Sequence, residues 1–381
     1  MKGTKKWGLL LGCMILAVMM LTGCGSTESK RIIRIGHNQS TNHPTHIALV
    51  AFQNFINEKL GDKYVVEVYP SELLGSQTDM VQLTQTGAID YCVASNAILE
   101  TFSKNYEIFN LPYLFASTEA YHHVMDDPEI TDQIFTATEK AGFRAVTWLD
   151  AGTRNFYTVK APINTPADLK GLKIRVQQSP TNIEMMRLLG GSATPMGFGD
   201  VYTALQSNII DGAENNEMAL TDNGHGDVCK YYSYDMHQMV PDILIGNEAF
   251  IEGLNDEERE IFEEGYQLVN KVQREEWVKA VEAAKDKAEN EQHVQFLYPD
   301  QIPFKEACLP LHETVLAGNP EIQPIYDQIQ EYNKQYPGTA EDAEETEAAA
   351  EKGSSDTESA AEAQTETESA QETETETEED T

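Results

Sequence analysis

Arg175 lies in a short alternation of apolar and polar residues, LKGLKIRVQQSP, at residues 169–180. Because successive side chains of a strand point to opposite faces, the apolar residues share one face, and Lys173 and Arg175 share the other. The pattern alone predicts a half-buried strand that shows its basic residues to water. If Arg175 faces a cavity instead, its guanidinium can bind a carboxylate through two parallel hydrogen bonds, which lysine cannot reproduce.

Four segments join an apolar stretch to side chains that form hydrogen bonds. They are GHNQS at 36–40, ASN at 94–96, IRVQQS at 174–179 and GAENN at 212–216. Each includes or follows a predicted strand, and ligands of α/β proteins usually bind in the crevice outside the carboxyl ends of the strands. We therefore expect binding residues in these segments.

The sequence lacks the motifs that define common catalytic centres. It contains no GxSxG, no P-loop, no HExxH, and no GxGxxG after a predicted strand. A glycosidase needs only two carboxylates, and 63 acidic residues make chance pairs unavoidable. His37, His43 and His46 are close in sequence, but their spacing fits no closed set of metal ligands. We expect no catalytic residue, no metal site and no cofactor.

Strands and helices alternate along the chain, which is typical of an α/β fold with mainly parallel sheets. The segments RIIRIG, YVVEVY, AIDYCVAS, FRAVTWL, RNFYTVK and IIDGAEN are predicted strands, in addition to the segment that carries Arg175. Predicted helices end at Gly61 and Gly87, and Ser76 with Asp79 is a predicted capping pair at the start of the second of these. Other predicted helices cover 117–125, 129–141, 179–191 and 199–208.

The longest predicted helix begins at a capping pair, Asn255 and Glu258, and extends to about Gln292. A helix near forty residues spans roughly 55 Å, which is longer than one small lobe. The part of the chain with core-forming composition has about 310 residues, beyond the size at which a single core stops growing. We expect two lobes and a helix that bridges them.

The first residues have the pattern of a secretory signal. Lys2, Lys5 and Lys6 precede an apolar run, which is too short for a confident membrane span. Leu21 to Cys24, LTGC, resemble the lipobox of bacterial lipoproteins. This resemblance implies a signal peptide over 1–23, a lipid on Cys24 and a linker over 24–30; an ordinary cleaved signal is the alternative.

Charge and cysteine content limit the partners. The net charge is −36, so nucleic acid is an unfavourable partner. From Thr339 onward the chain has 17 acidic residues, one lysine and no large apolar side chain, which predicts a disordered acidic tail over 338–381. Beyond the signal and Cys24, Cys92, Cys229 and Cys308 are predicted to be isolated buried thiols, although one bridge among them is the alternative.

Several longer segments resemble one known family. AGTRNFYTVKAPINTPADLKGLKIRVQ, GGSATPMGFGDVYTALQSNIIDGAENN, YPSELLGSQTDMVQLTQTGAIDYCVAS and NLPYLF occur in this family in the same order. The chain resembles the extracytoplasmic solute-binding proteins of TRAP (tripartite ATP-independent periplasmic) transporters, a dicarboxylate-binding type family. The resemblance covers most of 31–337 and excludes the acidic tail.

The resemblance implies a periplasmic-binding-protein-like fold in which two α/β lobes, joined by hinge strands and a long bridging helix, close around an organic acid. It implies a first lobe over 31–151 and 239–280, and a second over 152–238 and 281–337. It also implies these binding residues: Arg175 for the ligand carboxylate, Arg154 as a second contact, Asn215, Phe198, Asn38, and Gln77 and Ser95 at positions where specificity varies.

Most of these positions have a structural alternative. Asn215 could cap the following helix, Phe198 could belong to the core, and Arg154 could be a surface residue of a strand. Gln77 stands near a helix start, where polar side chains often bind the backbone. Sialic-acid binders of the family have acidic residues at the positions of Gln77 and Ser95, and this chain does not.

The expected function is therefore capture of an organic acid anion without chemistry. The ligand is expected to be a sugar acid such as a uronate, or a small di- or hydroxycarboxylate. The resemblance implies a lipid-anchored, extracytoplasmic monomer that delivers its ligand to TRAP permease subunits in the bacterial membrane. A secreted lipid-anchored hydrolase of a glycoside or ester is the rival of another class, and a structural surface lipoprotein is a third.

Overall fold

The computed structural model describes residues 30–338. The predicted signal peptide, the lipidation site Cys24, nearly all of the linker and the acidic tail lie outside the described residues. None of the helices between residues 30 and 338 is both long and apolar enough to cross a membrane.

The first sheet has five strands in the order β2-β1-β3-β10-β4. Their bounds are Arg31–Gly36 (β1), Tyr64–Tyr69 (β2), Tyr91–Ser95 (β3), Phe143–Leu149 (β4) and Asp242–Asn247 (β10). β10 is antiparallel to both of its neighbours, while β1 is parallel to β2 and β3. The expected parallel arrangement is thus interrupted by one strand.

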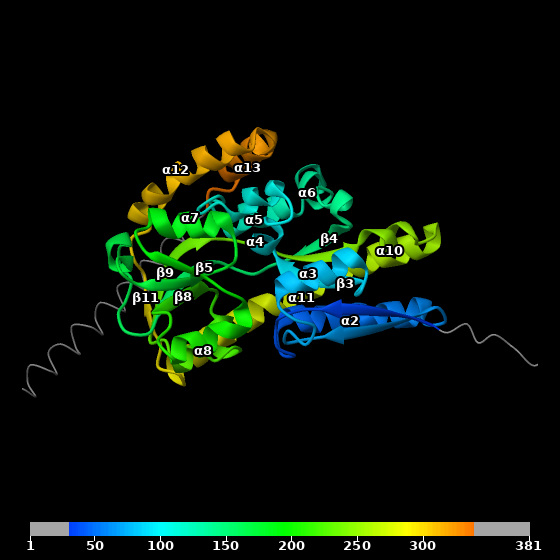
Figure 1. Ribbon diagram of the computed structural model, residues 1–381, viewed down its shortest axis with the longest axis horizontal. Helices are drawn as coiled ribbons and strands as arrows, with labels where there is room; N and C mark the ends of the chain where they lie inside the picture. Colours follow the sequence, from blue (N-terminus) through cyan, green and yellow to red (C-terminus); the bar gives the residue numbers. More distant parts are fainter. Residues whose placement is uncertain (1–29, 339–381) are drawn as a thin grey trace, which may run out of the picture.

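The second sheet has six strands in the order β11-β9-β5-β8-β6-β7. Their bounds are Arg154–Thr158 (β5), Lys173–Val176 (β6), Ser192–Pro195 (β7), Gly212–Asn215 (β8), Tyr231–Gln238 (β9) and Gln295–Leu297 (β11). Only β5 is antiparallel to its neighbours. The chain crosses between the sheets before β5, before β10 and, through α11, before β11, so each antiparallel strand follows a connection between the lobes (Figure 1).

Helices cover the sheets. Their bounds are Pro44–Leu60 (α2), Gln77–Thr86 (α3), Asn96–Leu99 (α4), Thr118–Met125 (α5), Pro128–Phe135 (α6), Pro180–Leu188 (α7), Val201–Gln206 (α8), Met218–Thr221 (α9), Glu248–Glu252 (α10), Asp256–Asn290 (α11), Ile302–Gly318 (α12) and Gln323–Gln335 (α13). The capping box that Ser76 forms with Asp79 begins α3, and Gly87 ends it in the left-handed conformation. Both signals were read correctly from the sequence.

The long helix α11 bridges the two lobes, as predicted. It begins at the capping box of Asn255 and Glu258. It packs against α2 and β4 beside the first sheet and against α9 beside the second (Figure 1). Its 35 residues are fewer than expected, but they still span roughly 50 Å. The predicted two-lobe α/β architecture with a bridging helix is confirmed.

Each sheet packs against a core of its own on one face and against a core shared by both sheets on the other. Phe52, Tyr91 and Phe262 belong to a cluster between the first sheet, α2 and α11, while Tyr157 and Tyr232 belong to a cluster on one face of the second sheet. A third cluster extends from the other face of the first sheet, through Phe304 of α12, to the other face of the second sheet. Cys92, Cys229 and Cys308 are free and buried in these cores, in agreement with the predicted isolated thiols.

Candidate functional site

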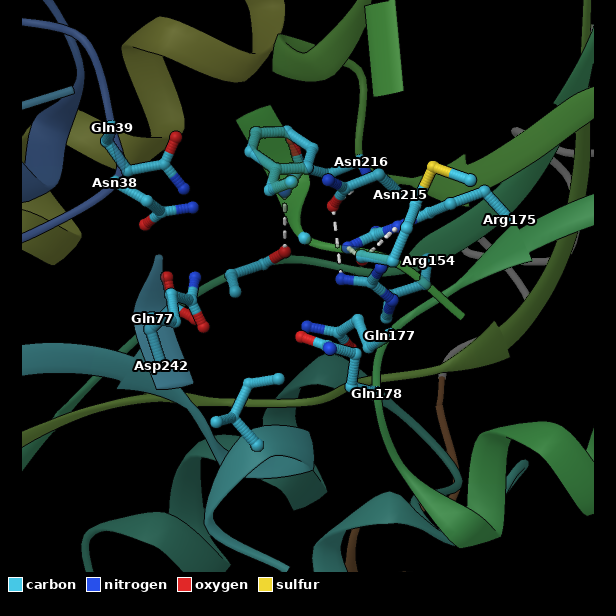
Figure 2. Close-up of a pocket in the computed structure, with 15 residues that line it drawn as sticks. Asn38, Gln39, Gln77, Arg154, Arg175, Gln177, Gln178, Asn215, Asn216 and Asp242 are labelled. Atoms are coloured by element: carbon cyan, nitrogen blue, oxygen red, sulfur yellow. Dashed lines mark hydrogen bonds between the residues drawn. The ribbon is translucent and has the colours of Figure 1, made fainter. Parts of the chain in front are cut away.

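A pocket opens between the two lobes, and six of the seven sequence-predicted residues line it. These are Arg154, Arg175, Phe198, Asn215, Asn38 and Gln77. The pocket has a volume of about 510 Å³, counting its open mouth. Figure 2 shows the arginines and Asn215 on one side and Asn38 and Gln77 on the other.

Arg175 is a buried guanidinium in this pocket. It lies on β6, between Ile174 and Val176, whose side chains are fully buried on the opposite face. Only 4% of Arg175 is exposed. Its Nε and Nη2 donate to the carbonyl oxygen of Met196 at 3.2 and 2.9 Å. The alternative of a solvated strand residue does not hold for Arg175, whereas Lys173 on the same face is exposed.

No acidic partner neutralises Arg175 within residues 30–338, since no carboxylate lies at ion-pair distance from its guanidinium. Burial lowers the pKa of Arg175, an effect that Glu214 opposes and Arg154 reinforces. An isolated buried cation is unfavourable unless it gains a counter-charge. The ring of Phe198 stands 5.5 Å from the guanidinium carbon and supplies a cation–π contact, which leaves the need for an anion unmet.

Arg154, by contrast, is neutralised by the protein. Its Nε donates to Glu214 Oε2 at 2.5 Å, its Nη2 to the Glu214 carbonyl at 2.9 Å and its Nη1 to Asn215 Oδ1 at 3.1 Å. Burial lowers the pKa of Arg154, but the charge of Glu214 outweighs it and raises the pKa overall. Arg154 is 4% exposed, so the sequence alternative of a surface residue is excluded.

Glu214 belongs to a buried cluster with a second cation and a second anion. His237 Nε2 lies 3.6 Å from Glu214 Oε2, and its Nδ1 lies 2.8 Å from Asp235 Oδ2. Burial would lower the pKa of His237, but Asp235 and Glu214 raise it to about 9. Burial likewise opposes ionisation of Glu214, but Arg154 and His237 lower its pKa to about 2. The two positive and two negative charges balance.

Asn215 contacts the pocket and Arg154, while Asn216 bonds to the start of the following helix. Asn215 Oδ1 accepts from Arg154 and from the amide of Asn216. The helix-capping role considered for Asn215 falls to Asn216, whose Oδ1 accepts from the amide of Met218 at 3.1 Å. Asn216 Nδ2 also donates to the carbonyl of Ala151, in the connection from β4 to β5. Asn215 therefore faces the pocket with its amide nitrogen free to donate.

Phe198 combines both roles considered from the sequence. It is partly buried, packs at the edge of the second-lobe core and also lines the pocket. Its ring meets His225 edge to face at 5.6 Å. Packing on one side thus fixes the ring that faces Arg175.

Ser95 is the predicted residue that the structure places outside the pocket wall. It is 2% exposed, and its amide donates to Gln77 Oε1 at 2.9 Å. Gln77 is the first residue of α3 and lines the pocket. Ser95 therefore stands behind Gln77 and orients its amide. The carboxamide oxygen of Asn38, on the same side of the pocket, has no hydrogen-bond partner among the described residues.

Other polar residues line the pocket that the sequence did not single out one by one. They are Gln39, Gln177, Gln178, Asn216 and Asp242. The first four belong to segments that were identified as strand ends, so the signal was present. Asp242 had no such signal, because it stands at the start of a strand whose antiparallel direction brings that start to the same edge.

The three histidines near the first strand form hydrogen bonds within the protein. His37 Nε2 and His46 Nδ1 are 3.0 Å apart, and His43 Nδ1 accepts from the amide of Thr45. Burial lowers the pKa of His37 and of His43 to about 3, so both are neutral at pH 7. Across residues 30–338, no cluster of acidic, histidine and cysteine side chains has the arrangement of a metal site.

Two lobes, the segments that connect them and a polar pocket between them define a solute-binding protein of the periplasmic type. The chain belongs to the bacterial extracellular solute-binding protein family 7 (DctP), whose model matches residues 35–319. The predicted membership among TRAP solute-binding proteins is thereby confirmed, with the extracytoplasmic setting that it implies.

Solved structures of this class resemble the chain closely. A TRAP periplasmic solute-binding protein from Anaerococcus prevotii, with bound D-glucuronate, is 68% identical with a TM-score of 0.80, and the match covers 81% of this chain and all of that one. A protein from a Sulfitobacter species, with bound β-D-galacturonate, is 30% identical with a TM-score of 0.76, over 79% and 100% of the two chains. The protein YiiZ of Salmonella typhimurium is 39% identical over 80% of this chain and 92% of its own.

Proposed function

We propose that this protein binds a uronate such as D-glucuronate and delivers it to the membrane subunits of a TRAP transporter. The observation that carries the proposal is the buried guanidinium of Arg175, which faces the pocket with no carboxylate at ion-pair distance among residues 30–338. A ligand carboxylate would supply the missing charge through two parallel hydrogen bonds. Arg154, already paired, would contribute a secondary contact and hold Asn215 toward the ligand.

The rest of the pocket suits the hydroxyl groups of a sugar. Asn38, Gln77, Gln177 and Gln178 offer carboxamide groups, which both donate and accept hydrogen bonds. The uronates bound by the Anaerococcus and Sulfitobacter proteins support this ligand class over sialic acid. Ser95, at the other position that is acidic in sialic-acid binders, lies behind the pocket wall.

Ligand capture would stabilise a closed arrangement of the lobes. Arg154, Arg175, Phe198 and Asn215 come from the second sheet and its connections, while Asn38 and Gln77 come from the first. A ligand that contacts both sets stabilises the state in which they are close. We assign the lobes to 31–151 with 239–280 and to 152–238 with 281–337.

The cellular setting follows from the sequence and the family. We propose that Cys24 carries the lipid anchor, that the protein acts as a monomer outside the membrane, and that it catalyses no reaction on its ligand. The acidic tail would then extend beyond the second lobe as a solvated segment. No feature of the pocket favours the hydrolase considered from the sequence.

Isothermal titration calorimetry tests the proposed ligand. D-Glucuronate and D-galacturonate should bind, while D-glucose, which lacks the carboxylate, should bind at least about 30-fold more weakly, because a buried charge pair is worth about 2 to 5 kcal/mol. Thermal melting in the presence of each sugar gives a second measurement. Equal binding of glucose and glucuronate, or turnover of a glucuronide, would contradict the proposal.

A further inference from the structure

The pocket is electrostatically polarised. Figure 2 shows Arg154, Arg175 and Asn215 on one side and Asn38, Gln77 and Asp242 on the other. Among the residues that line the pocket, Asp242 is the acidic one, and Arg154 and Arg175 are the basic ones. A ligand that fills the pocket therefore meets positive charge at one end and a carboxylate at the other.

Asp242 is held firmly in this position. It is the first residue of β10, and its backbone pairs in register with Ser95 of β3 on one side and Leu149 of β4 on the other. It is 7% exposed. Its carboxylate makes no hydrogen bond or ion pair with any side chain or backbone group of residues 30–338, although Arg154 is close enough to influence it. Because Asp242 lines the open pocket, hydroxyl groups of a ligand can reach its carboxylate and donate to it.

The ionised form of Asp242 prevails at neutral pH. Burial raises its pKa to about 6, and Arg154 opposes this rise. The phenol of Tyr121 is the other titratable group whose pKa is coupled to Asp242, and burial holds it neutral throughout the physiological range. An ionised carboxylate only accepts hydrogen bonds, so it attracts hydroxyl groups and repels a second carboxylate.

We propose that Asp242 is the residue that makes the pocket specific for acids with one carboxylate and several hydroxyl groups, and that it excludes dicarboxylates. The proposal rests on the function argued above, because it assumes that Arg175 receives the ligand carboxylate. The hydroxyl-bearing end of a uronate would then donate to Asp242. An aldarate, which carries a carboxylate at each end, would place like charges together, and such juxtaposition strongly disfavours a wrong partner.

Substitution Asp242→Asn tests this assignment, because the amide has nearly the same shape without the charge. Titration calorimetry at pH 7.5 would measure D-glucuronate against two diacids, D-glucarate and the smaller L-malate. We expect wild-type protein to prefer glucuronate by about 100-fold or more, and the variant to lose about tenfold or more of that preference. Asp286→Asn, which removes an exposed charge on α11, is the matched control and should change neither ratio.

The outcomes separate this inference from the proposed function. If wild-type protein does not bind glucuronate, the proposed function fails. If it binds glucuronate and the folded variant keeps the same preference over both diacids, only the assignment of Asp242 is overturned.

A second measurement on the wild-type protein remains decisive if the variant does not fold. Lowering the pH from 8 to 5 protonates Asp242, so the preference for D-glucuronate over D-glucarate, a diacid that largely keeps both charges at pH 5, should shrink. Malate is left out of this measurement, because its own second carboxylate begins to protonate there. A preference that is equal at both pH values overturns the assignment.

Discussion

Two buried arginines in one pocket differ in how their charge is compensated. Arg154 donates hydrogen bonds to Glu214 and Asn215, both within the protein. Arg175 donates to a single carbonyl oxygen and has no carboxylate at ion-pair distance among the described residues. A neutral acceptor compensates a buried cation only in part. We therefore predict that the affinity for the ligand depends more on Arg175 than on Arg154.

Substitution of Arg175 should weaken uronate binding strongly. Arg175→Ala leaves the ligand carboxylate buried without its partner, which costs about 2 to 5 kcal/mol, or about 30-fold to several thousand-fold in affinity. Arg175→Lys keeps the charge but loses the paired hydrogen bonds, so we expect a loss of at least about tenfold. Calorimetric titration with D-glucuronate measures both.

The control for this measurement is Arg187→Lys on α7, an exposed arginine that pairs with Glu184. It should leave the affinity within about twofold, because exposed ion pairs contribute little. Unchanged affinity in a folded Arg175→Lys variant would show that Arg175 does not form paired hydrogen bonds with the ligand carboxylate.

Local sequence pattern predicted some pocket residues and could not predict others. Alternation placed Arg175 opposite the apolar face of its strand, and β6 has this pattern. No local pattern, however, distinguishes Arg175 from Lys173, because the groups that enclose Arg175 come from residues 196–198, about twenty positions later in the chain. Glu214 was missed because its partner Arg154 is 60 residues away in the sequence. Asp242 was missed because the antiparallel direction of its strand could not be predicted.

At the scale of elements, one carboxylate connects the two lobes. Glu100 follows α4 beside the first sheet, and it accepts from Ser179 Oγ at 2.5 Å and from the amide and hydroxyl of Thr181 at 3.0 and 2.9 Å. Asn110 Nδ2 donates to it as well, at 2.7 Å. These contacts cap the amino end of α7, where a negative charge is favourable. Because α7 follows Gln177 and Gln178, the cap also positions pocket residues.

Glu100→Gln should therefore lower both stability and uronate affinity. The amide cannot accept from donors at both terminal atoms, so at least one charge-assisted hydrogen bond is lost, at about 1.5 to 3 kcal/mol. We expect a lower melting temperature and weaker binding of D-glucuronate.

Glu107→Gln is the matched control, because Glu107 is a nearby, partly exposed acid without these contacts. It should leave the affinity unchanged and should not lower the melting temperature, because burial and the charge of Glu100 already raise the pKa of Glu107. If Glu100→Gln destabilises the protein and leaves the affinity unchanged, the cap has no role in positioning the pocket.

Element boundaries were predictable where local capping chemistry sets them. Both predicted capping boxes occur. The helix predicted over 129–141 was wrong in extent: α6 ends at Phe135, and only a short 3₁₀ turn follows at Glu139–Ala141. Thr136 Oγ1 bonds back to the carbonyl of Asp132, and such side-chain bonds compete with the helical ladder. Strand direction in β5 and β10 was unpredictable, because it depends on the crossing between lobes.

The C-terminal helices show a similar limit at the scale of the molecule. Two lobes and a bridging helix followed from chain length and helix length. The packing of α12 on α7 and of α13 on α5 did not, because α5 belongs beside the first sheet and α7 beside the second. Helices late in the sequence thus contact both lobes, and no pattern within them specifies their partners.

Buried histidines make the stability of the whole molecule depend on pH. The charged cluster raises the pKa of His237 to about 9 in the folded protein, against about 6.5 in an unfolded chain. Because the pKa is raised on folding, the proton on His237 stabilises the folded protein fully below pH 6.5, and this stabilisation is lost as the pH rises to 9. His37, His43 and His225, with pKa values lowered to about 3, are neutral in both states above pH 7.5 and do not affect this range.

The free energy of unfolding should therefore fall as the pH rises from 7.5 to 9. His237 should contribute up to about 1.4 kcal/mol per pH unit, because the folded protein binds up to one proton more at this site than the unfolded chain. The buried thiols of Cys92, Cys229 and Cys308, whose pKa burial raises to about 12, add to the fall as the thiols of the unfolded chain ionise. Urea unfolding at several pH values measures the slope, and His237→Asn should reduce it while the exposed His123→Gln keeps it. In the wild-type protein, the NMR titration of the His237 ring should have its midpoint well above pH 7. A midpoint near 6.5 would show that Asp235 and Glu214 do not hold the proton, and the neutral balance of the cluster would then be wrong.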